Sequence, residues 1–175
     1  MVLSPSETLC LSCGMCCSGS LHNWTKLQPH EKIPAQQSGL TVFTRRDGTP
    51  AFRQPCTAFE DPVCTIYTHR PEACRSYVCP LLKRLMDGEI SLDEALGYTR
   101  QVRHLIASLQ SKMPAPMPGV PLEWQVRLSW PPADALPPDV QPIFEELAGL
   151  LKTVWLIKWK RRKKSAAKKA KCQFK

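Results

Sequence analysis

The chain has 175 residues, a length that suits one domain with or without a tail. Hydrophobic residues make up 43% and charged residues 22% of the sequence, which is ordinary for a globular protein and excludes collagen, coiled coil and full disorder. No run approaches the roughly 20 apolar residues that a membrane-spanning helix needs. The unusual counts are 17 prolines and 9 cysteines, and they direct attention to thiol chemistry.

The net charge of +9 comes from one end of the chain. Residues 158–175 contain ten lysines and arginines and no acidic residue. The remaining 157 residues carry fourteen basic and fifteen acidic side chains, so the body is nearly neutral. The sequence therefore predicts a neutral folded body with a basic, disordered tail.

The first cysteine run is Cys10-x-x-Cys13-x-x-Cys16-Cys17. If this segment were helical, its four sulfurs would lie within an arc of roughly 120°. A tight loop at Gly14 would bring them together as well, and the sequence leaves both conformations open. The spacing is similar to that of an iron–sulfur loop, which Cys79-Pro80 would close.

Residues 21–55 form a polar connector between the two cysteine runs. Within it, residues 40–44 and 50–53 flank Asp47-Gly48, which predicts a hairpin. The second run follows, and seven, nine and four residues separate its members Cys56, Cys64, Cys74 and Cys79. It lacks the second C-x-x-C of a zinc ribbon, so the common nucleic-acid zinc modules do not fit.

The middle of the chain is predicted to be helical. A short helix over residues 81–86 should end at Gly88. The capping box that begins at Ser91 then starts a helix whose apolar period continues to about residue 110.

Nine prolines between residues 114 and 142 exclude a helix through that segment. Apolar residues alternate with polar ones over 122–130, which predicts a half-buried strand. From Pro142 to about Lys164 the helical period returns. These elements give three parts: a cysteine-cluster metal-binding domain over 1–112, a Pro-rich segment with a strand and a packed helix over 113–157, and the tail over 158–175.

Disulfides are the first alternative for so many cysteines. An exported disulfide scaffold needs a signal, and residues 1–11 have neither a basic start nor a long apolar run. The number of cysteines is odd, and the adjacent Cys16 and Cys17 suit two bridges poorly. We therefore expect reduced thiols and a cytoplasmic location.

The two cysteine runs together resemble the signature of the CxxCxxCC family of zinc- or iron-chelating proteins. The second half of that signature is the stretch from Cys64 through Tyr67, Arg70-Pro71 and Cys74-Arg75 to Tyr77, preceded by Cys56. The resemblance covers residues 10–96. It implies zinc or iron held by eight cysteines, in two four-thiolate sites or in one such site and an iron–sulfur cluster of the 4Fe-4S type; the ligands are Cys10, Cys13, Cys16, Cys17, Cys56, Cys64, Cys74 and Cys79.

Several other residues are candidates around these thiols. Arg70 and Arg75 could donate hydrogen bonds to the sulfurs, or Arg70 could cap a loop before Pro71. Tyr67 is a further neighbour of the site, although core packing is the simpler role for both Tyr67 and Tyr77. His69 could replace one cysteine as a ligand, whereas Cys172 is expected to be a free thiol in the tail.

Three classes of function remain. The first is a metal-binding protein, and we expect a small α+β fold stabilised by that metal: a cysteine-rich N-terminal half of irregular loops and a short hairpin, a helical middle, one strand and a C-terminal helix. The second is an enzyme, a redox protein or a methylase, because one branch of the family is similar to flagellin lysine N-methylases. No glycine-rich loop for a nucleotide cofactor is evident. The third is a zinc-stapled nucleic-acid module.

The tail over 158–175 has three interpretations. It could be a solvated, solubilising segment, it could contact nucleic-acid phosphates, or it could lie on an anionic membrane surface. No protein partner is predicted.

Overall fold

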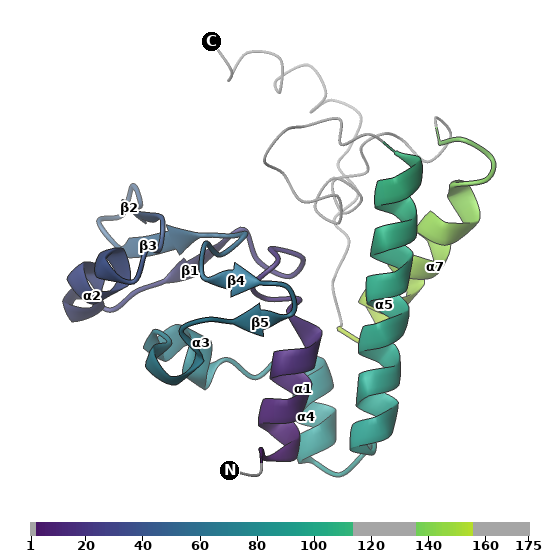
Figure 1. Cartoon of the computed structure of the whole chain (residues 1–175), viewed down its shortest axis with the longest axis horizontal. Coiled ribbons are helices and arrows are strands. Elements are labelled where there is room, and N and C mark those ends of the chain that lie inside the picture. The colour runs from purple at the N-terminus through teal and green to yellow at the C-terminus, as the bar shows by residue number, and fades with distance from the viewer. Residues whose placement is uncertain (1–2, 114–135, 156–175) are drawn as a thin grey trace.

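The structure is a computed structural model that describes residues 3–113 and 136–155. It contains both helices and sheets, which confirms the mixed fold class, and has two regions that meet at the N-terminal helix (Figure 1). The predicted strand over 122–130 and the tail over 158–175 lie outside the described residues. None of the helices in the described ranges has the length and apolarity to cross a membrane.

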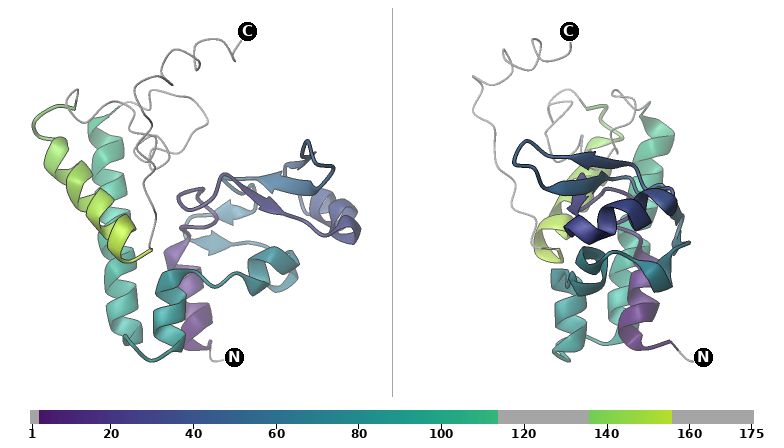
Figure 2. Two further views of the ribbon diagram at one scale, coloured as in Figure 1. Left: turned by 180° about the vertical axis from the view of Figure 1, so that it is seen from behind. Right: turned by 90° about the vertical axis from the view of Figure 1, so that its left-hand side faces the viewer.

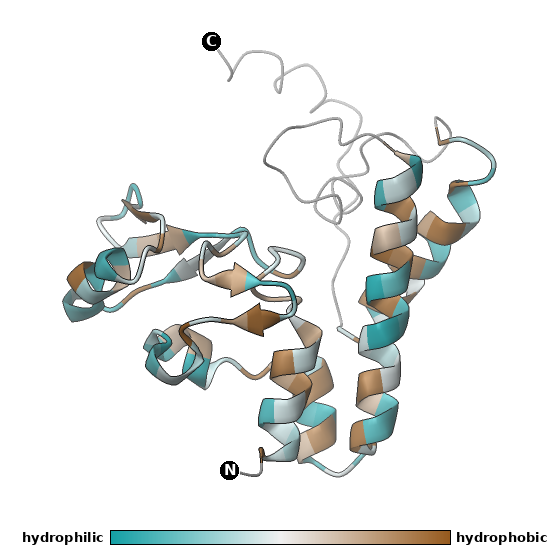
Figure 3. Cartoon of the chain, viewed as in Figure 1, coloured by the Kyte–Doolittle hydropathy of each residue, from teal (hydrophilic) through white to brown (hydrophobic). Residues whose placement is uncertain are grey.

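The first region, which we call the helical layer, consists of four α-helices: α1 (Pro5–Cys13), α4 (Pro80–Met86), α5 (Leu92–Lys112) and α7 (Gln141–Thr153). The long helix α5 packs against the other three. Hydrophobic and hydrophilic residues alternate along α5 and α7, as Figure 3 shows. Fully buried side chains such as Leu81, Leu109 and Leu147 therefore form a continuous apolar core.

The second region, the sheet lobe, comprises residues 24–76 and projects to one side of the helical layer (Figure 2). Its sheet has the antiparallel order β1 (Trp24–Lys26), β3 (Pro50–Arg53), β2 (Val42–Thr44). Helix α2 (Lys32–Gln37) follows a 3₁₀ turn over Pro29–Glu31. The core of the sheet lobe consists of only five buried residues, namely Leu27, Ala35, Leu40, Phe52 and Ala58.

The rest of the lobe is made of short elements. A two-stranded sheet joins β4 (Phe59–Glu60) to β5 (Val63–Cys64), with Phe59 opposite Cys64. A 3₁₀ turn over Tyr67–His69 and helix α3 (Glu72–Ser76) follow, and α3 packs against β1. These elements carry two of the eight predicted ligands, Cys64 and Cys74.

Most of the predicted local elements are confirmed. The hairpin forms from β2 and β3 around Asp47-Gly48, and Gly48 has the positive φ that such a turn favours. Helix α4 ends just before Gly88, and Ser91 and Glu94 form the capping box of α5. The C-terminal helix begins as predicted but ends at Thr153 rather than near Lys164. The two residues that follow it, Val154 and Trp155, are both buried.

The structure also contains elements that the sequence analysis missed. The connector over 21–55 contains β1 and α2 in addition to the hairpin. Helix α1 was visible in principle, because Ser4 and Glu7 form a capping box and Pro5 stands at the first helical position.

Candidate metal centre

Helix α1 positions the first two cysteines. Cys10 and Cys13 are three residues apart and therefore lie on the same face of the helix. Gly14 ends α1 in the left-handed conformation, with φ of 64°, and the chain then turns through Cys16 and Cys17. The two conformations left open by the sequence are thus both used, the helix for the first pair and a turn for the second.

Gly14 is also a point of close contact between the two regions. A Cβ atom at this position would stand 2.5 Å from Cζ of Phe59, far inside any normal contact. The ring of Phe59 in β4 thereby packs directly on the backbone at the end of α1. Glycine is required here for two reasons, the positive φ and the absence of a side chain.

The second cysteine run is brought to the first by the folding of the sheet lobe. Cys56 follows β3, and its backbone N–H donates to the carbonyl of Cys17 over 2.8 Å. Cys64 ends β5 and Cys74 lies in α3. Cys79 is the N-cap of α4, where its sulfur accepts a hydrogen bond from the backbone N–H of Leu82 over 3.4 Å.

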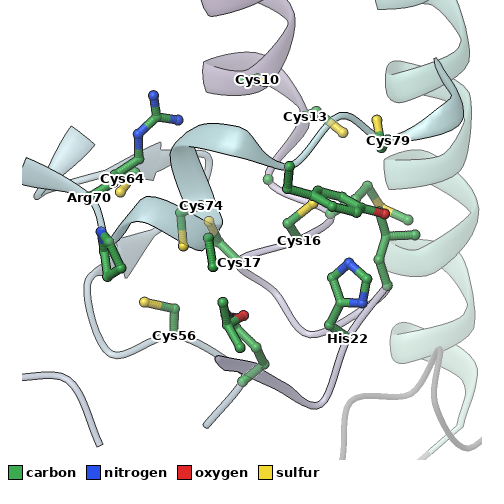
Figure 4. Close-up of a pocket in the computed structure, with 18 of the residues that line it drawn as sticks. Cys10, Cys13, Cys16, Cys17, His22, Cys56, Cys64, Arg70, Cys74 and Cys79 are labelled. Carbon is green, nitrogen blue, oxygen red and sulfur yellow. Dashed lines mark hydrogen bonds between the residues drawn. The ribbon is translucent and has the colours of Figure 1, made fainter. Parts of the chain in front are cut away.

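All eight predicted cysteines line a single cavity of about 280 Å³ between the helical layer and the sheet lobe (Figure 4). Each is partly buried, and none forms a disulfide. Their convergence agrees with the expectation that thiols placed for metal must lie together. The cavity wall is otherwise mainly apolar, with Leu9, Met15 and Phe52 among its residues.

Backbone N–H groups support four of the sulfurs. Besides the bond from Leu82 to Cys79, hydrogen bonds reach three other thiols from the residue two positions further on: Met15 to Cys13, Ala58 to Cys56 and Ile66 to Cys64. Each of these bonds lowers the pKa of its thiol and so favours the thiolate. Hydrogen bonds to a sulfur are the kind of support that metal ligands receive from their surroundings.

Burial acts in the opposite direction. It raises the pKa of Cys13 to about 12, against the hydrogen bond from Met15, and it raises the pKa of Cys74 to about 12. Burial followed by repulsion from Cys13 raises the pKa of Cys16 well above its ordinary value. These thiols are protonated at neutral pH until something replaces the proton.

Cys17 and Cys64 form a hydrogen-bonded pair. The thiol of Cys17 donates to the sulfur of Cys64, which raises the pKa of Cys17 and lowers that of Cys64. The ionised form of Cys64 is thus stabilised by its neighbour. A thiolate of this kind is a ready ligand for a soft or borderline metal ion.

Arg70 supplies positive charge to the cavity. Its guanidinium lies 3.5 Å from the centroid of the Tyr67 ring, and its Nε donates to the Tyr67 carbonyl over 2.8 Å. Its charge opposes the burial that raises the pKa values of Cys10 and Cys74. Arg75 donates to the carbonyl of Arg70 over 2.6 Å and so braces the loop before Pro71.

The structure places at the cavity one pair that sequence reasoning missed, of which Figure 4 labels His22. The rings of His22 and Tyr77 meet edge to face, with centroids 4.8 Å apart. Burial, then repulsion from Cys16 and Cys79, raises the pKa of Tyr77 to about 12, so the ring stands beside those sulfurs. Nothing in the spacing of His22 signals this position.

The other candidates lie apart from the cavity or beyond the described residues. His69 is exposed and does not line the cavity, and its Nδ1 stands 2.9 Å from the Thr68 hydroxyl. His104 is exposed on α5. Cys172 lies outside the described residues.

The donor set fits zinc or iron in chemistry and in number, because soft thiolates are the ligands that zinc and iron–sulfur centres prefer. Across the described residues, no three cysteine, histidine or carboxylate side chains are already close enough to hold one ion. Binding would therefore require the cysteine side chains to move inward from the cavity wall and to release their protons.

Comparison with known proteins agrees with this chemistry. Residues 9–90 match the family model CxxCxxCC, whose description is "Putative zinc- or iron-chelating domain". No curated protein and no solved structure gives a significant match to the chain. The match confirms the resemblance indicated by the two cysteine runs: residues 9–90 are similar to the CxxCxxCC family.

Proposed function

We propose that this protein binds zinc or iron through its eight N-terminal cysteines. The observation that carries the proposal is the convergence of all eight free thiols on one cavity, although 38 residues separate Cys17 from Cys56. A fold that gathers eight thiols without pairing them leaves them available as ligands. Reduced thiols also suit the cytoplasm, where we expect the protein to work.

The surroundings of the cavity are suited to holding thiolates. The four backbone N–H···S bonds stabilise negative charge on the sulfurs, and the Arg70 guanidinium offsets part of it. The apolar wall excludes water, which strengthens these electrostatic interactions. A bound ion would take the place of the protons that burial keeps on Cys13 and Cys74.

The direct test is metal analysis of the full chain purified without oxygen. We expect zinc or iron in whole-number ratio to protein; a visible spectrum then separates colourless zinc from a brown iron–sulfur protein. Absence of both metals, in protein as purified and after addition of zinc or of ferrous iron with sulfide, would overturn the proposal.

A pair of variants tests the ligands. Cys74→Ser should lower both metal content and melting temperature, because metal binding contributes directly to folding in small cysteine sites. Cys172→Ser is the matched control, since Cys172 lies outside both cysteine runs. Equal metal content and equal melting temperatures for the two variants would contradict the assignment of Cys74.

A further inference from the structure

Neither cysteine run forms a compact group by itself. A grouping by run would give one site from Cys10 to Cys17 and another from Cys56 to Cys79, but the side chains are distributed differently. Figure 4 shows four of them toward the helical layer, and these pack against its apolar core: Cys10, Cys13, Cys16 and Cys79. We call them the helical thiol set.

The other four gather on the side of the sheet lobe in the same view: Cys17, Cys56, Cys64 and Cys74. We call these the lobe thiol set. Cys56 and Cys74 pack against the small core of the lobe. Cys17 joins them through two hydrogen bonds. Its backbone carbonyl accepts from the N–H of Cys56, and its thiol donates to the sulfur of Cys64.

Electrostatic neighbours give the same division. Wherever other thiols raise the pKa of a cysteine, the strongest of them belongs to its own set: Cys79 acts on Cys10 and Cys13, and Cys13 acts on Cys16. In the lobe set, Cys64 acts on Cys17 and Cys56, and Cys56 acts on Cys74. The boundary therefore falls between the adjacent residues Cys16 and Cys17.

We infer that the protein has two separate four-thiol metal centres, one formed by the helical thiol set and one by the lobe thiol set. This inference rests on the proposed function and assigns the eight ligands to their centres. Each centre takes three cysteines from one run and the fourth from the other. Four thiolates are the complete ligand number of a structural zinc site and of one cubane iron–sulfur cluster.

The support from backbone N–H groups is divided evenly. Cys13 and Cys79 of the helical set each accept such a bond, as do Cys56 and Cys64 of the lobe set. Each set thus contains two sulfurs that accept a hydrogen bond from a nearby backbone N–H group. Because each centre joins both runs, each ion would hold two distant parts of the chain together. An ion in the lobe centre would link Cys17 to Cys56, and an ion in the helical centre would link Cys16 to Cys79.

Two double variants separate this division from a grouping by run. Cys13→Ser with Cys79→Ser removes two ligands from the helical set and leaves the lobe set complete. Cys13→Ser with Cys17→Ser removes one ligand from each set, although both residues belong to the first run. The probe is Co²⁺ added to the metal-free full chain, because its visible absorption in a tetrahedral site reports how many sulfurs bind it.

We expect the full chain to bind two Co²⁺ ions in four-sulfur sites. The Cys13/Cys79 variant should keep half of that four-sulfur absorption, and the Cys13/Cys17 variant should keep none. The reverse result would assign each run to its own centre and overturn the inference. Equal losses in both variants would also overturn it, since they would indicate one joint cluster. If the full chain binds no zinc, iron or Co²⁺, the proposed function itself fails.

A second measurement remains informative if one double variant folds poorly. In the zinc-loaded Cys13/Cys79 variant, alkylation followed by peptide mass spectrometry should modify the remaining helical thiols Cys10 and Cys16. The four lobe thiols should stay protected to the same extent as in the full chain. Loss of protection at Cys17, while far-UV circular dichroism shows native helix content, would contradict the division.

Discussion

The helical layer and the sheet lobe differ in what stabilises them. The layer buries a large continuous core between α1, α4, α5 and α7, with Leu81, Leu109, Leu147 and Leu151 almost completely buried. The lobe is built on strands of two to four residues and a core of five buried residues. Strands this short are marginal in water without further support. We therefore expect bound metal to matter more for the stability of the lobe than for that of the helical layer.

The largest expected effect is therefore that of metal removal. A chelator should abolish amide-exchange protection in residues 24–76 and leave most of it in α5 and α7, because structural zinc can contribute on the order of 10 kcal/mol to folding. Hydrogen exchange with and without chelator measures this, and adding zinc back is the control. Uniform loss across both regions would mean that they unfold as one unit.

The next effect is at the junction of the two regions. Gly14→Ala combines a positive φ with a Cβ atom placed against the Phe59 ring, so it should cost roughly 3 kcal/mol of unfolding free energy. Gly88→Ala is the matched control, since Gly88 has φ of 73° and nothing within 4 Å of its added Cβ. Urea unfolding of the two variants should show a smaller loss for Gly88→Ala. Equal losses would show that the Phe59 ring can move aside.

The buried thiols give a pH dependence of stability that should differ between the metal-free and the metal-bound protein. Without metal, Cys13 and Cys74 keep their protons up to a pKa of about 12, whereas unfolded thiols ionise near 8.5. Their contribution to stability is complete below about pH 8.5 and is lost as the pH rises toward 12, by up to about 1.4 kcal/mol per pH unit for each thiol. Metal affinity should rise over the same range, because binding releases protons.

Melting temperatures at pH 7 and pH 10, with and without bound zinc, test this difference. We expect the metal-free protein to lose stability at the higher pH and the zinc-loaded protein to lose less. Cys13→Ser controls for the ionisation of lysine and tyrosine side chains, and its metal-free form should show a shallower decline. A melting temperature of the metal-free chain that does not change with pH would argue against protonated buried thiols.

The sequence analysis predicted those elements whose signals lie within a few neighbouring residues. The hairpin at Asp47-Gly48 and the start of α5 at Ser91 were predictable because turn and capping residues act over a few positions. Strand β4 and its partner β5 were missed because two residues cannot show a period of two. Helix α1 was missed although Ser4 and Glu7 marked its start.

The same limit applies to the metal centre. The eight cysteines that line the cavity could be named from the two cysteine runs and the family resemblance that these runs carry. Which cysteine joins which set depends on the contact of β4 with α1 and on the place of Cys79 at the start of α4. These are long-range contacts, and no local pattern encodes them. The concentration of positive charge in residues 158–175, in contrast, can be counted directly in the sequence.

The smallest expected effect concerns an ion pair between the two regions. Arg103 of α5 pairs with Asp61, which lies between β4 and β5, and their side chains are 34% and 60% exposed. Exposed pairs contribute about 0–1 kcal/mol, so Asp61→Asn should change the unfolding free energy by less than 1 kcal/mol. Asp139→Asn is the matched control, because it breaks a similarly exposed pair with Lys112 inside the helical layer. In urea unfolding at low salt, the two variants should lose equal, small amounts of unfolding free energy. At high salt these losses should vanish. If Asp61→Asn also lowered metal content, the ion pair rather than the thiols would be holding the lobe against α5, and the lobe could no longer be regarded as stabilised chiefly by its metal.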